Sequence, residues 1–572
     1  MFKDLNIPKS FPFPYSPETF TKKEKDILLN FFTNIDKPVF GIYNLPQEVV
    51  GAMFSRYSRS DKSVRRLFLD EFWDPSFSTL KSNSKSLQKA TDRTNNFYKK
   101  VYAEYGDDSV IQVGSIHIAF EFVSQIAVQI IEDQRIGASY IEKSTRYVNF
   151  GNKVGKHYLY SDVPEIVKSE FKKEFKDWNN FAFDSYNKHL ITATEYFSKK
   201  YPLESFADIR EIKDLEEIEK LKRAHQRAVR AKAFDTVRNF LPTTVITNLG
   251  AHYSGQAAEN TINKLLISPF AEARLLGKMA YNELYKISPN FLQNIDNKHG
   301  ESARNYRKEI SNLHLKTVNK YFKNINTQED LDEVKIVDWD KDPLFKIASQ
   351  ILYTSQLNTR YSKKQIGVWL MKNKKLIPEI IKSSVPDRSK KEYNRRHKLP
   401  RAFEQAYIEL EFFKDFGIYR DLRRNRISST ERLSLNPSSL YVPPEYYEKG
   451  MEEVLKDCLM LDKKTKELYK KILKSKNPEL KTASEYITIL GHKLRFNIRA
   501  NIRQWVFFSE LRTIAGGHPS YRNAMQKAVL EITKKMPELW PLFAKVDWVE
   551  DYGLGRMKAE IYTQEMLSKI KK

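Results

Sequence analysis

Apolar residues recur at helical spacing along most of the chain, which is typical of amphipathic helices. A few short segments are instead rich in the β-branched and aromatic residues that favour strands. This pattern predicts a helix-rich α+β fold. The expected helices span residues 53–72, 108–133, 165–199, 214–240, 257–287, 344–372, 403–424, 451–474, 483–514 and 521–535. The expected strands span residues 144–150, 157–160 and 435–442.

The two halves of the chain share a weak repeat. Glu-Phe pairs at 121–122 and 411–412 are followed about a dozen residues later by Arg-Ile pairs at 135–136 and 426–427. A serine-rich loop and an extended aromatic segment come next in each half. The alternative is a chance similarity between two helix-loop-strand units. The repeat predicts two similar domains, residues 1–323 and 343–572, joined by a polar linker at residues 324–342.

Composition supports a folded protein with several cores. The chain has 572 residues, 41% of them hydrophobic, with 97 basic and 72 acidic side chains and a formal net charge of +25. A positive charge of this size can bind nucleic acid, bind anionic small molecules or keep a protein in solution. Because Lys and Arg are spread along the sequence and interleaved with Asp and Glu, phosphate-bearing metabolites explain the charge at least as well as nucleic acid does.

Cys458 is the only cysteine, which excludes intrachain disulfides, cysteine zinc sites and iron–sulfur clusters. We expect it to pack in a core. The scattered histidines show no metal-binding spacing on a helix, so we expect no metal. The first 17 residues lack the apolar region of a signal peptide, and no apolar run approaches the ~18 residues of a membrane span. We therefore expect a cytoplasmic protein.

Arginines are concentrated beside one loop of the second half. The segment 420–436, RDLRRNRISSTERLSLN, contains five arginines and four Ser/Thr hydroxyls. Guanidinium groups with hydroxyls suit phosphate oxygens, although a solvated basic helix face gives the same pattern. We expect Arg495, Arg499 and Arg503 to share a helix face. Arg512 precedes a glycine turn at residues 515–519.

These residues resemble the signature of the flavin-dependent thymidylate synthases, in which R-H-R is followed after seven residues by S-x-R-Y. The second half has R-N-R at residues 424–426 and then Ser434, with Asn425 in place of the family histidine. The first half retains Ser144 and the R-Y pair at 146–147 but has lost both arginines of R-H-R.

The resemblance extends on both sides of the signature. The family has a histidine and glutamate upstream, which the second half keeps as His397 and Glu404. Downstream, the family's arginine before a Leu-Pro turn is Arg238 in the first half. The second half alone retains the later N-x-R motif at 501–503 and the arginine at 512.

The losses in the two halves are complementary. The resemblance implies a tandem duplication in which each half keeps its share of a composite site, as subunits of the family's homotetramer do. The implied dUMP-binding residues are Glu142, Ser144, Arg146 and Arg238 from the first half and Arg424 and Arg512 from the second, with Ser144 and Arg512 acting in catalysis. The implied FAD-binding residues are His397, Glu404, Arg426, Ile427, Asn501 and Arg503.

By this resemblance the protein is a flavoprotein that methylates dUMP to dTMP, with methylenetetrahydrofolate as carbon donor and NADPH as reductant. It would act as a homodimer that imitates the family tetramer. The alternatives are alkylation of another pyrimidine nucleotide, or a non-catalytic nucleic-acid-binding relative. His518 is a candidate replacement for the missing histidine, but we expect it to be solvent-exposed or to cap a helix.

Overall fold

The computed structural model describes residue 15 and residues 18–45, 47–73, 112, 114–206, 212, 214–322 and 332–570. The chain divides into two compact units. Unit 1 contains Met1–Lys188, Phe240–Gln328 and Lys456–Ile489, and unit 2 contains His189–Asn239, Glu329–Leu455 and Leu490–Lys572. Neither unit is therefore built from one half of the sequence alone.

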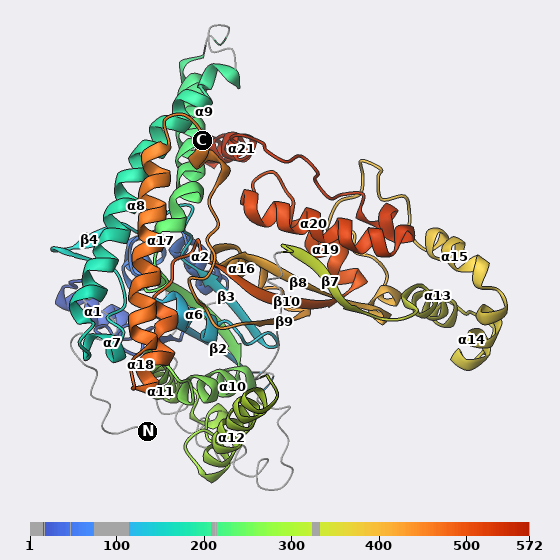
Figure 1. The fold of residues 1–572 in the computed structure, drawn as a ribbon, viewed down its shortest axis with the longest axis horizontal. Helices are drawn as coiled ribbons and strands as arrows, with labels where there is room; N and C mark the ends of the chain where they lie inside the picture. Colours follow the sequence, from blue (N-terminus) through green and yellow to red (C-terminus); the bar gives the residue numbers. More distant parts are fainter. Residues whose placement is uncertain are drawn as a thin grey trace. The chain divides into compact units, whose positions relative to one another are not determined.

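Unit 1 contains a four-stranded antiparallel sheet in the order β1-β2-β6-β3 (Figure 1). Its second strand reads SIHIAFEFVS, whose Ile, Phe and Val residues suit a buried pleated surface. A separate hairpin pairs β4 with β5. The strands are β1 (Val39–Ile42), β2 (Ser115–Ser124), β3 (Ala138–Glu142), β4 (Lys153–Val154), β5 (His157–Tyr158) and β6 (Ile246–Ser254).

Unit 2 contains a second antiparallel sheet in the order β7-β8-β10-β9. In both sheets the last strand of the half lies between the second and third strands, so the topology repeats. This confirms the expectation of two similar domains in a helix-rich α+β fold. The strands are β7 (Val334–Trp339), β8 (Tyr407–Asp415), β9 (Ser428–Arg432) and β10 (Lys493–Asn501).

The two sheets differ by a β-bulge in β2. Phe120 pairs with Leu249 and Val123 with Thr247, so Glu121 and Phe122 together face Asn248. The strand pair β8–β10 has no such interruption. A bulge bends its strand and re-aims side chains. The bulge also changes the expected correspondence between the two Glu-Phe pairs. Phe412 pairs with Phe496 as Phe120 pairs with Leu249, so Phe412 corresponds to Phe120 and not to Phe122.

Helices pack on both faces of the sheet in unit 1. One apolar cluster includes Phe40, Met53, Phe54 and Leu67, which join the sheet to α2 and α3. The helices are α1 (Lys22–Leu28), α2 (Gln47–Tyr57), α3 (Val64–Leu67), α6 (Gln125–Ile131), α7 (Pro164–Val167), α10 (Gly255–Leu266), α11 (Ala271–Tyr285), α12 (Lys298–Tyr321) and α18 (Pro478–Ala483).

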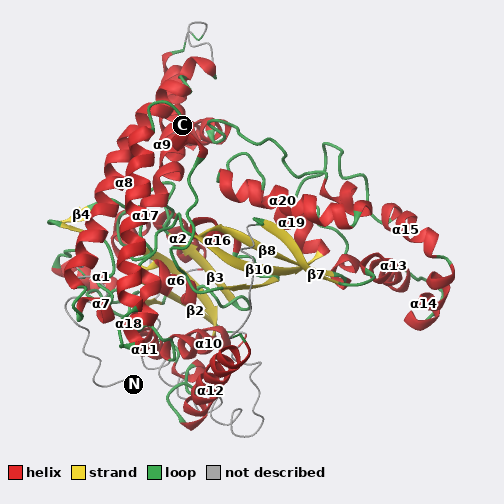
Figure 2. Ribbon diagram, viewed as in Figure 1, coloured by secondary structure: helices red, strands yellow, loops and turns green. Residues whose placement is uncertain are grey.

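In unit 2, α19 and α20 pack along the sheet, as Figure 2 shows. The helices of unit 2 are α9 (Leu215–Val237), α13 (Pro343–Thr354), α14 (Lys363–Lys372), α15 (Ile377–Ser383), α16 (Phe416–Leu422), α19 (Ile502–Arg512), α20 (Pro519–Lys535) and α21 (Met557–Ile570). Two long helices, α8 (Lys172–Lys200) and α17 (Glu452–Leu473), run from one unit into the other.

Each unit contains a helical segment contributed by the opposite half of the sequence. In unit 1, Trp178 Nε1 donates a hydrogen bond of 2.8 Å to Thr465 Oγ1. In unit 2, the hydroxyl of Tyr446 donates one of 2.9 Å to the carbonyl of Thr236 in α9. The short 3-10 helix η4 (Arg238–Phe240) follows α9 directly. The exchange therefore brings Arg238, a first-half residue, into unit 2.

Several expected elements were wrong. The predicted helices at 108–133, 403–424 and 483–514 contain the strands β2, β8 and β10, each of which leads into a shorter helix. The predicted strands at 144–150 and 435–442 are turns and irregular backbone, although residues just before them form β3 and β9. Residues 101–111 and residues 324–331, the first part of the expected linker, lie outside the described residues, whereas residues 334–339 of that linker form β7.

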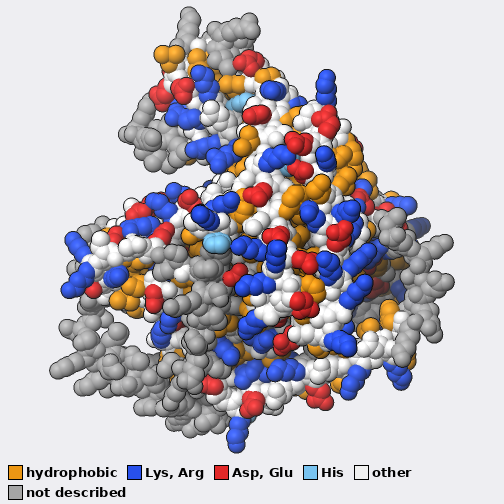
Figure 3. All heavy atoms as spheres, turned by 60° about the vertical axis from the view of Figure 1, so that its left-hand side comes forward, with side chains coloured by type: hydrophobic (Ala, Val, Ile, Leu, Met, Phe, Trp, Pro, Cys, Tyr) orange, Lys and Arg blue, Asp and Glu red, His pale blue; other side chains and the backbone are white. Residues whose placement is uncertain are grey.

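Two further expectations concern Cys458 and membranes. Cys458 is buried, as expected, and burial raises the pKa of its thiol to about 12, so it has the properties of a packing residue. Among the described helices, none has the length and apolar character needed to span a membrane. On the face drawn in Figure 3, Lys and Arg side chains are interspersed with Asp and Glu rather than gathered into one patch.

Candidate active site

Arg238 and two aspartates form the centre of a charged cluster in unit 2. The Nη2 atom of Arg238 lies 3.8 Å from Oδ1 of Asp415, and its Nη1 lies 3.7 Å from Oδ2 of Asp421. Arg238 is only 2% exposed. Its Nε and Nη2 atoms have no hydrogen-bond acceptor among the described residues. A buried guanidinium with unused donors is suited to an anionic ligand.

Asp421 brings two further arginines to the same place. Nη2 of Arg424 donates a hydrogen bond of 3.1 Å to Oδ1 of Asp421, and Nη2 of Arg512 donates one of 2.6 Å to the Asp421 carbonyl. The three arginines come from η4, from the turn after α16 and from the end of α19. Three guanidinium groups from three elements therefore converge on one aspartate.

Asp415 holds the base of this cluster in place. It is 1% exposed and caps α16, because its Oδ1 accepts a hydrogen bond of 3.0 Å from the backbone of Ile418. Its Oδ2 accepts one of 2.6 Å from Ser520 Oγ. Burial raises the pKa of Asp415, while the positive charge of Arg238 opposes that rise. Asp415 thus positions both α16 and Arg238.

The residues that the resemblance assigns to FAD include a linked pair in unit 2. Nη1 of Arg503 lies 2.7 Å from Oε1 of Glu404, and its Nε donates a hydrogen bond to the Leu399 carbonyl. Asn501 caps α19, where its Oδ1 accepts a hydrogen bond of 2.8 Å from the backbone of Gln504. The structure therefore brings Glu404 and Arg503 together, with Asn501 two residues before Arg503.

Asn425, which replaces the family histidine, lies beside this group. Its Oδ1 accepts a hydrogen bond of 2.7 Å from Nε2 of Gln504. Its Nδ2 is buried and has no acceptor among the described residues. A buried donor without a partner is unusual and fits a ligand that presents an acceptor, such as a flavin ring. This position is therefore compatible with FAD although the family histidine is absent.

The remaining predicted FAD residues are exposed. They are His397, Arg426 and Ile427. Nδ1 of His397 accepts a hydrogen bond of 3.1 Å from the backbone of Asn394. His518 caps α20, because its Nδ1 accepts a hydrogen bond from the backbone of Ser520. This is one of the two positions expected for it, a helix cap or an exposed site. It is nevertheless buried, and its Nε2 lies 3.2 Å from the Asp235 carbonyl.

The predicted helix face of three arginines was wrong. Arg495 and Arg499 lie on the strand β10, where side chains repeat every two residues, whereas Arg503 lies on the helix α19. The three arginines therefore do not share a helix face. Arg495 pairs with Glu411 at 3.0 Å and Arg499 with Asp338 at 3.3 Å. Both arginines are thus neutralised by acids of the same sheet, on β8 and β7.

The first-half residues Glu142, Ser144 and Arg146 lie in unit 1. Glu142 ends β3 and is buried, and its Oε1 accepts a hydrogen bond of 3.2 Å from Gln125. The backbone N–H of Ser144 donates one of 2.9 Å to the Ser58 carbonyl. Oγ of Ser144 accepts one of 3.3 Å from the backbone of Arg146. These contacts fix the loop that carries the S-x-R-Y motif.

Asp415 and Asp421 were missed by sequence reasoning. The signal for Asp421 was present, since it is the acid within the arginine-rich segment RDLRRNR. The signal for Asp415 was its place before a short apolar stretch, where an N-cap aspartate often begins a helix.

Comparisons with known proteins found a matching family model and similar chains. A family model described as "Thymidylate synthase complementing protein" matches residues 60–290 and 335–538. A UPF0159 protein of Chlamydia muridarum is 33% identical over 554 residues, which cover 95% of this chain and 98% of that protein. A UPF0159 protein of Thermoplasma acidophilum is 28% identical over 522 residues, covering 89% of this chain and 97% of that protein.

Proposed function

Because the chain belongs to the thymidylate synthase complementing protein family, we propose that it is a flavin-dependent thymidylate synthase. It would methylate dUMP to dTMP with methylenetetrahydrofolate as carbon donor and NADPH as reductant. The duplicated match, over residues 60–290 and 335–538, agrees with a tandem-duplicated member. Both halves would contribute residues to one composite site.

The convergence of Arg238, Arg424 and Arg512 on Asp421 is the observation that carries this proposal. The first of these arginines comes from the first half of the sequence and the other two from the second half, yet all lie in unit 2. A dianionic phosphate in a partly dry cleft needs several guanidinium donors. Neither half alone supplies all three.

In this proposal Arg238 and Arg424 bind the nucleotide phosphate. Arg512 holds the pyrimidine edge and stabilises negative charge that develops on the base, which is a preorganised electrostatic role. We propose that Glu142, Ser144 and Arg146 also bind the nucleotide, on the strength of their motif alone. Cys458 takes no part, because its buried thiol has a raised pKa.

Glu404, Asn501 and Arg503, with Asn425, would hold FAD, and His397, Arg426 and Ile427 would contact it from exposed positions. The bound flavin supplies the redox chemistry of the reaction. The role of the protein is to bind and orient the substrates, and the buried Nδ2 of Asn425 offers a donor that no described residue uses.

An absorbance spectrum of the pure protein, followed by a dUMP turnover assay, tests the proposal. We expect flavin absorbance, either as purified or after reconstitution with FAD, and formation of dTMP from dUMP and methylenetetrahydrofolate. A protein that cannot be reconstituted with FAD would contradict the proposal. If the protein binds flavin but alkylates a different pyrimidine nucleotide, that nucleotide replaces dUMP as the proposed substrate, and the site assignment stands.

A further inference from the structure

Unit 1 contains a cavity of about 260 Å³, and none of its lining residues is assigned above to the nucleotide or to FAD. It opens beside the β2 bulge and the loop after β3. Apolar walls come from Phe122, Phe150 and Ile246. The polar lining includes Lys143, Asn149 and Asn248 and, at exposed positions, Asp61, Asn152 and Lys153. Small-molecule sites are usually apolar clefts with a few convergent polar groups, and this volume is slightly below their usual ~300–1,000 Å³. The cavity therefore suits a small ligand.

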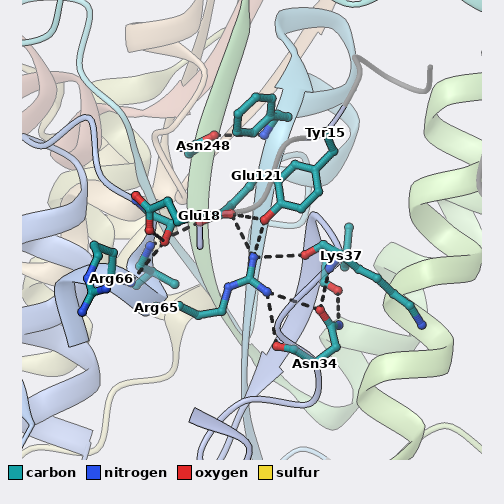
Figure 4. A network of polar contacts seen from close by, with 12 residues as sticks. Tyr15, Glu18, Asn34, Lys37, Arg65, Arg66, Glu121 and Asn248 are labelled. Carbon is teal, nitrogen blue, oxygen red and sulfur yellow. Dashed lines mark hydrogen bonds and ion pairs between the residues drawn. The ribbon is translucent and has the colours of Figure 1, made fainter. Parts of the chain in front are cut away.

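Glu121, which lines the cavity, forms a buried ion pair with Arg65 (Figure 4). Arg65 and Glu121 are each 1% exposed, and Nη2 of Arg65 lies 3.3 Å from Oε2 of Glu121. The Glu121 carboxylate also accepts hydrogen bonds from the hydroxyls of Tyr15, at 3.1 Å, and Tyr57, at 3.0 Å. The backbone of Val64 donates a further one of 3.2 Å. The acceptor capacity of Glu121 is thus already used within the protein.

Among the lining groups that are not exposed to solvent, those without a partner are donors, whereas Asp61, which also lines the cavity, is an exposed acceptor. Nζ of Lys143 has no hydrogen bond or ion pair with any described residue, and its nearest recorded contact is the Phe150 ring, 6.0 Å away. Asn149 and Asn248 each use Oδ1 to accept a backbone hydrogen bond, from Gly151 and Phe122, at 2.8 and 2.9 Å. Their Nδ2 groups have no acceptor among the described residues. One ammonium group and two amide groups of the cavity can therefore donate hydrogen bonds to a ligand.

The backbone at the bulge supports a functional role for the cavity. Phe122 has a φ of 58°, in the left-handed region that non-glycine residues rarely adopt. Such strain costs about 1–3 kcal/mol and is concentrated at functional sites. The hydrogen bond from Phe122 to Asn248 holds this conformation and orients the Asn248 amide. The strained residue and one of the three donors are therefore linked directly.

The charge at Lys143 defines the ligand further. Burial lowers the pKa of Lys143, and the acids Asp61 and Glu121 only partly oppose that effect. A partly buried ammonium without an ion pair gains from a counter-charge. A dianionic phosphate would bring two further negative charges into a lining whose two lysines, Lys143 and Lys153, are already outnumbered by the acids Glu18, Asp61 and Glu121. A single carboxylate matches the ammonium, and its two oxygens match the amide donors.

We propose that this cavity is a binding site for a small monocarboxylate with an apolar body. The carboxylate would bind Lys143, Asn149 and Asn248, and the body would pack against Phe122, Phe150 and Ile246. Because Lys143 stands between Glu142 and Ser144 in the chain, such a ligand would also contact the segment that carries the S-x-R-Y motif. The proposal does not depend on the thymidylate synthase assignment.

Saturation-transfer NMR on the full-length protein tests this site with benzoate as the probe. Benzyl alcohol and benzylamine serve as neutral and cationic probes of similar shape. We expect saturable benzoate binding to the wild type, little binding of benzyl alcohol and none of benzylamine. Lys143→Met should weaken benzoate binding at least tenfold. Lys156→Met, which removes an exposed lysine from the nearby β4–β5 turn, should leave it unchanged.

A second variant tests the same site if Lys143→Met does not fold. Val154 lines the cavity and is 43% exposed, so Val154→Trp should fill the cavity with little effect on folding. We expect it to abolish benzoate binding while the thermal unfolding midpoint stays close to that of the wild type. Equal benzoate binding by the wild type, by Lys143→Met and by Val154→Trp would overturn the proposal. So would preferential binding of benzylamine, or no benzoate binding at all.

Discussion

The Nη1 atom of Arg238 lies 3.7 Å from Oδ2 of Asp421, although 183 residues separate the two in the chain. Arg238 belongs to the first half of a duplicated sequence and Asp421 to the second. The contact arises because α9 and Arg238, which the first half contributes, belong to unit 2. Under the function proposed above, gene duplication followed by complementary loss of residues accounts for a cluster whose arginines come from both halves.

Asp421 competes with an anionic substrate for the guanidinium groups of this cluster. We predict that Asp421→Asn strengthens binding of dUMP several-fold, because removing the carboxylate frees Arg238 and Arg424 for phosphate at a gain of about 1 kcal/mol. Isothermal titration with dUMP measures the effect. Asp338→Asn, which breaks an exposed Arg–Asp pair elsewhere in unit 2, should not change the affinity. Weaker binding by Asp421→Asn would instead mean that the carboxylate itself contacts the substrate.

Arg238 and Asp415 form a buried pair, so removing one partner leaves the other charge uncompensated. We expect Arg238→Met to lower the free energy of unfolding by about 3–5 kcal/mol. The double variant Arg238→Met with Asp415→Asn should recover much of that loss, since asparagine still caps α16. Urea unfolding of both variants measures this coupling. If the double variant is as unstable as the sum of the two single ones, the pair does not interact.

Glu333 lies among three lysines of unit 2. Its Oε2 accepts hydrogen bonds of 2.6 Å from Lys414 and Lys527, and its Oε1 lies 3.3 Å from Lys493. Burial alone would raise the pKa of Glu333, but the two lysine hydrogen bonds outweigh it and lower the pKa from 4.5 to about 2. Since the folded-state pKa is lower, this stabilisation is complete above about pH 4.5 and is lost as pH falls toward 2.

Urea unfolding at pH 5 and pH 3 checks this dependence. We expect the wild type to lose more stability between these values than Glu333→Gln does. Glu538→Gln, at an exposed position, should behave like the wild type. An identical loss in the wild type and in Glu333→Gln would show that Glu333 does not contribute.

The sequence predicted the grouping of three arginines better than it predicted the local structure. Arg238, Arg424 and Arg512 were selected from a motif, and the structure places them in one cluster. By contrast, β8 reads YIELEFFKD and continues directly into α16, so a short buried strand and a helix shared one apolar run. Periodicity alone does not separate these two structures over so few residues. The aspartate between them, Asp415, was the one local boundary signal.

Other features depend on tertiary structure and were not predictable from one sequence. The exchange of α9 into unit 2 depends on which surface buries its apolar face, which a local pattern does not specify. The β2 bulge and its positive φ at Phe122 appear only in the strand pairing. Lys143 is unremarkable in the sequence, and its importance comes from the cavity and the lack of a partner.

Titration of dUMP into variants from each half tests most directly whether the halves share a site. Arg146→Ala and Arg238→Ala change the first half, and Arg424→Ala changes the second. We predict that each of the three abolishes measurable dUMP binding, because all serve one composite site, while far-UV circular dichroism shows that the variants remain folded. Variants that each retain about half of the wild-type binding sites, with unchanged affinity, would contradict the shared site.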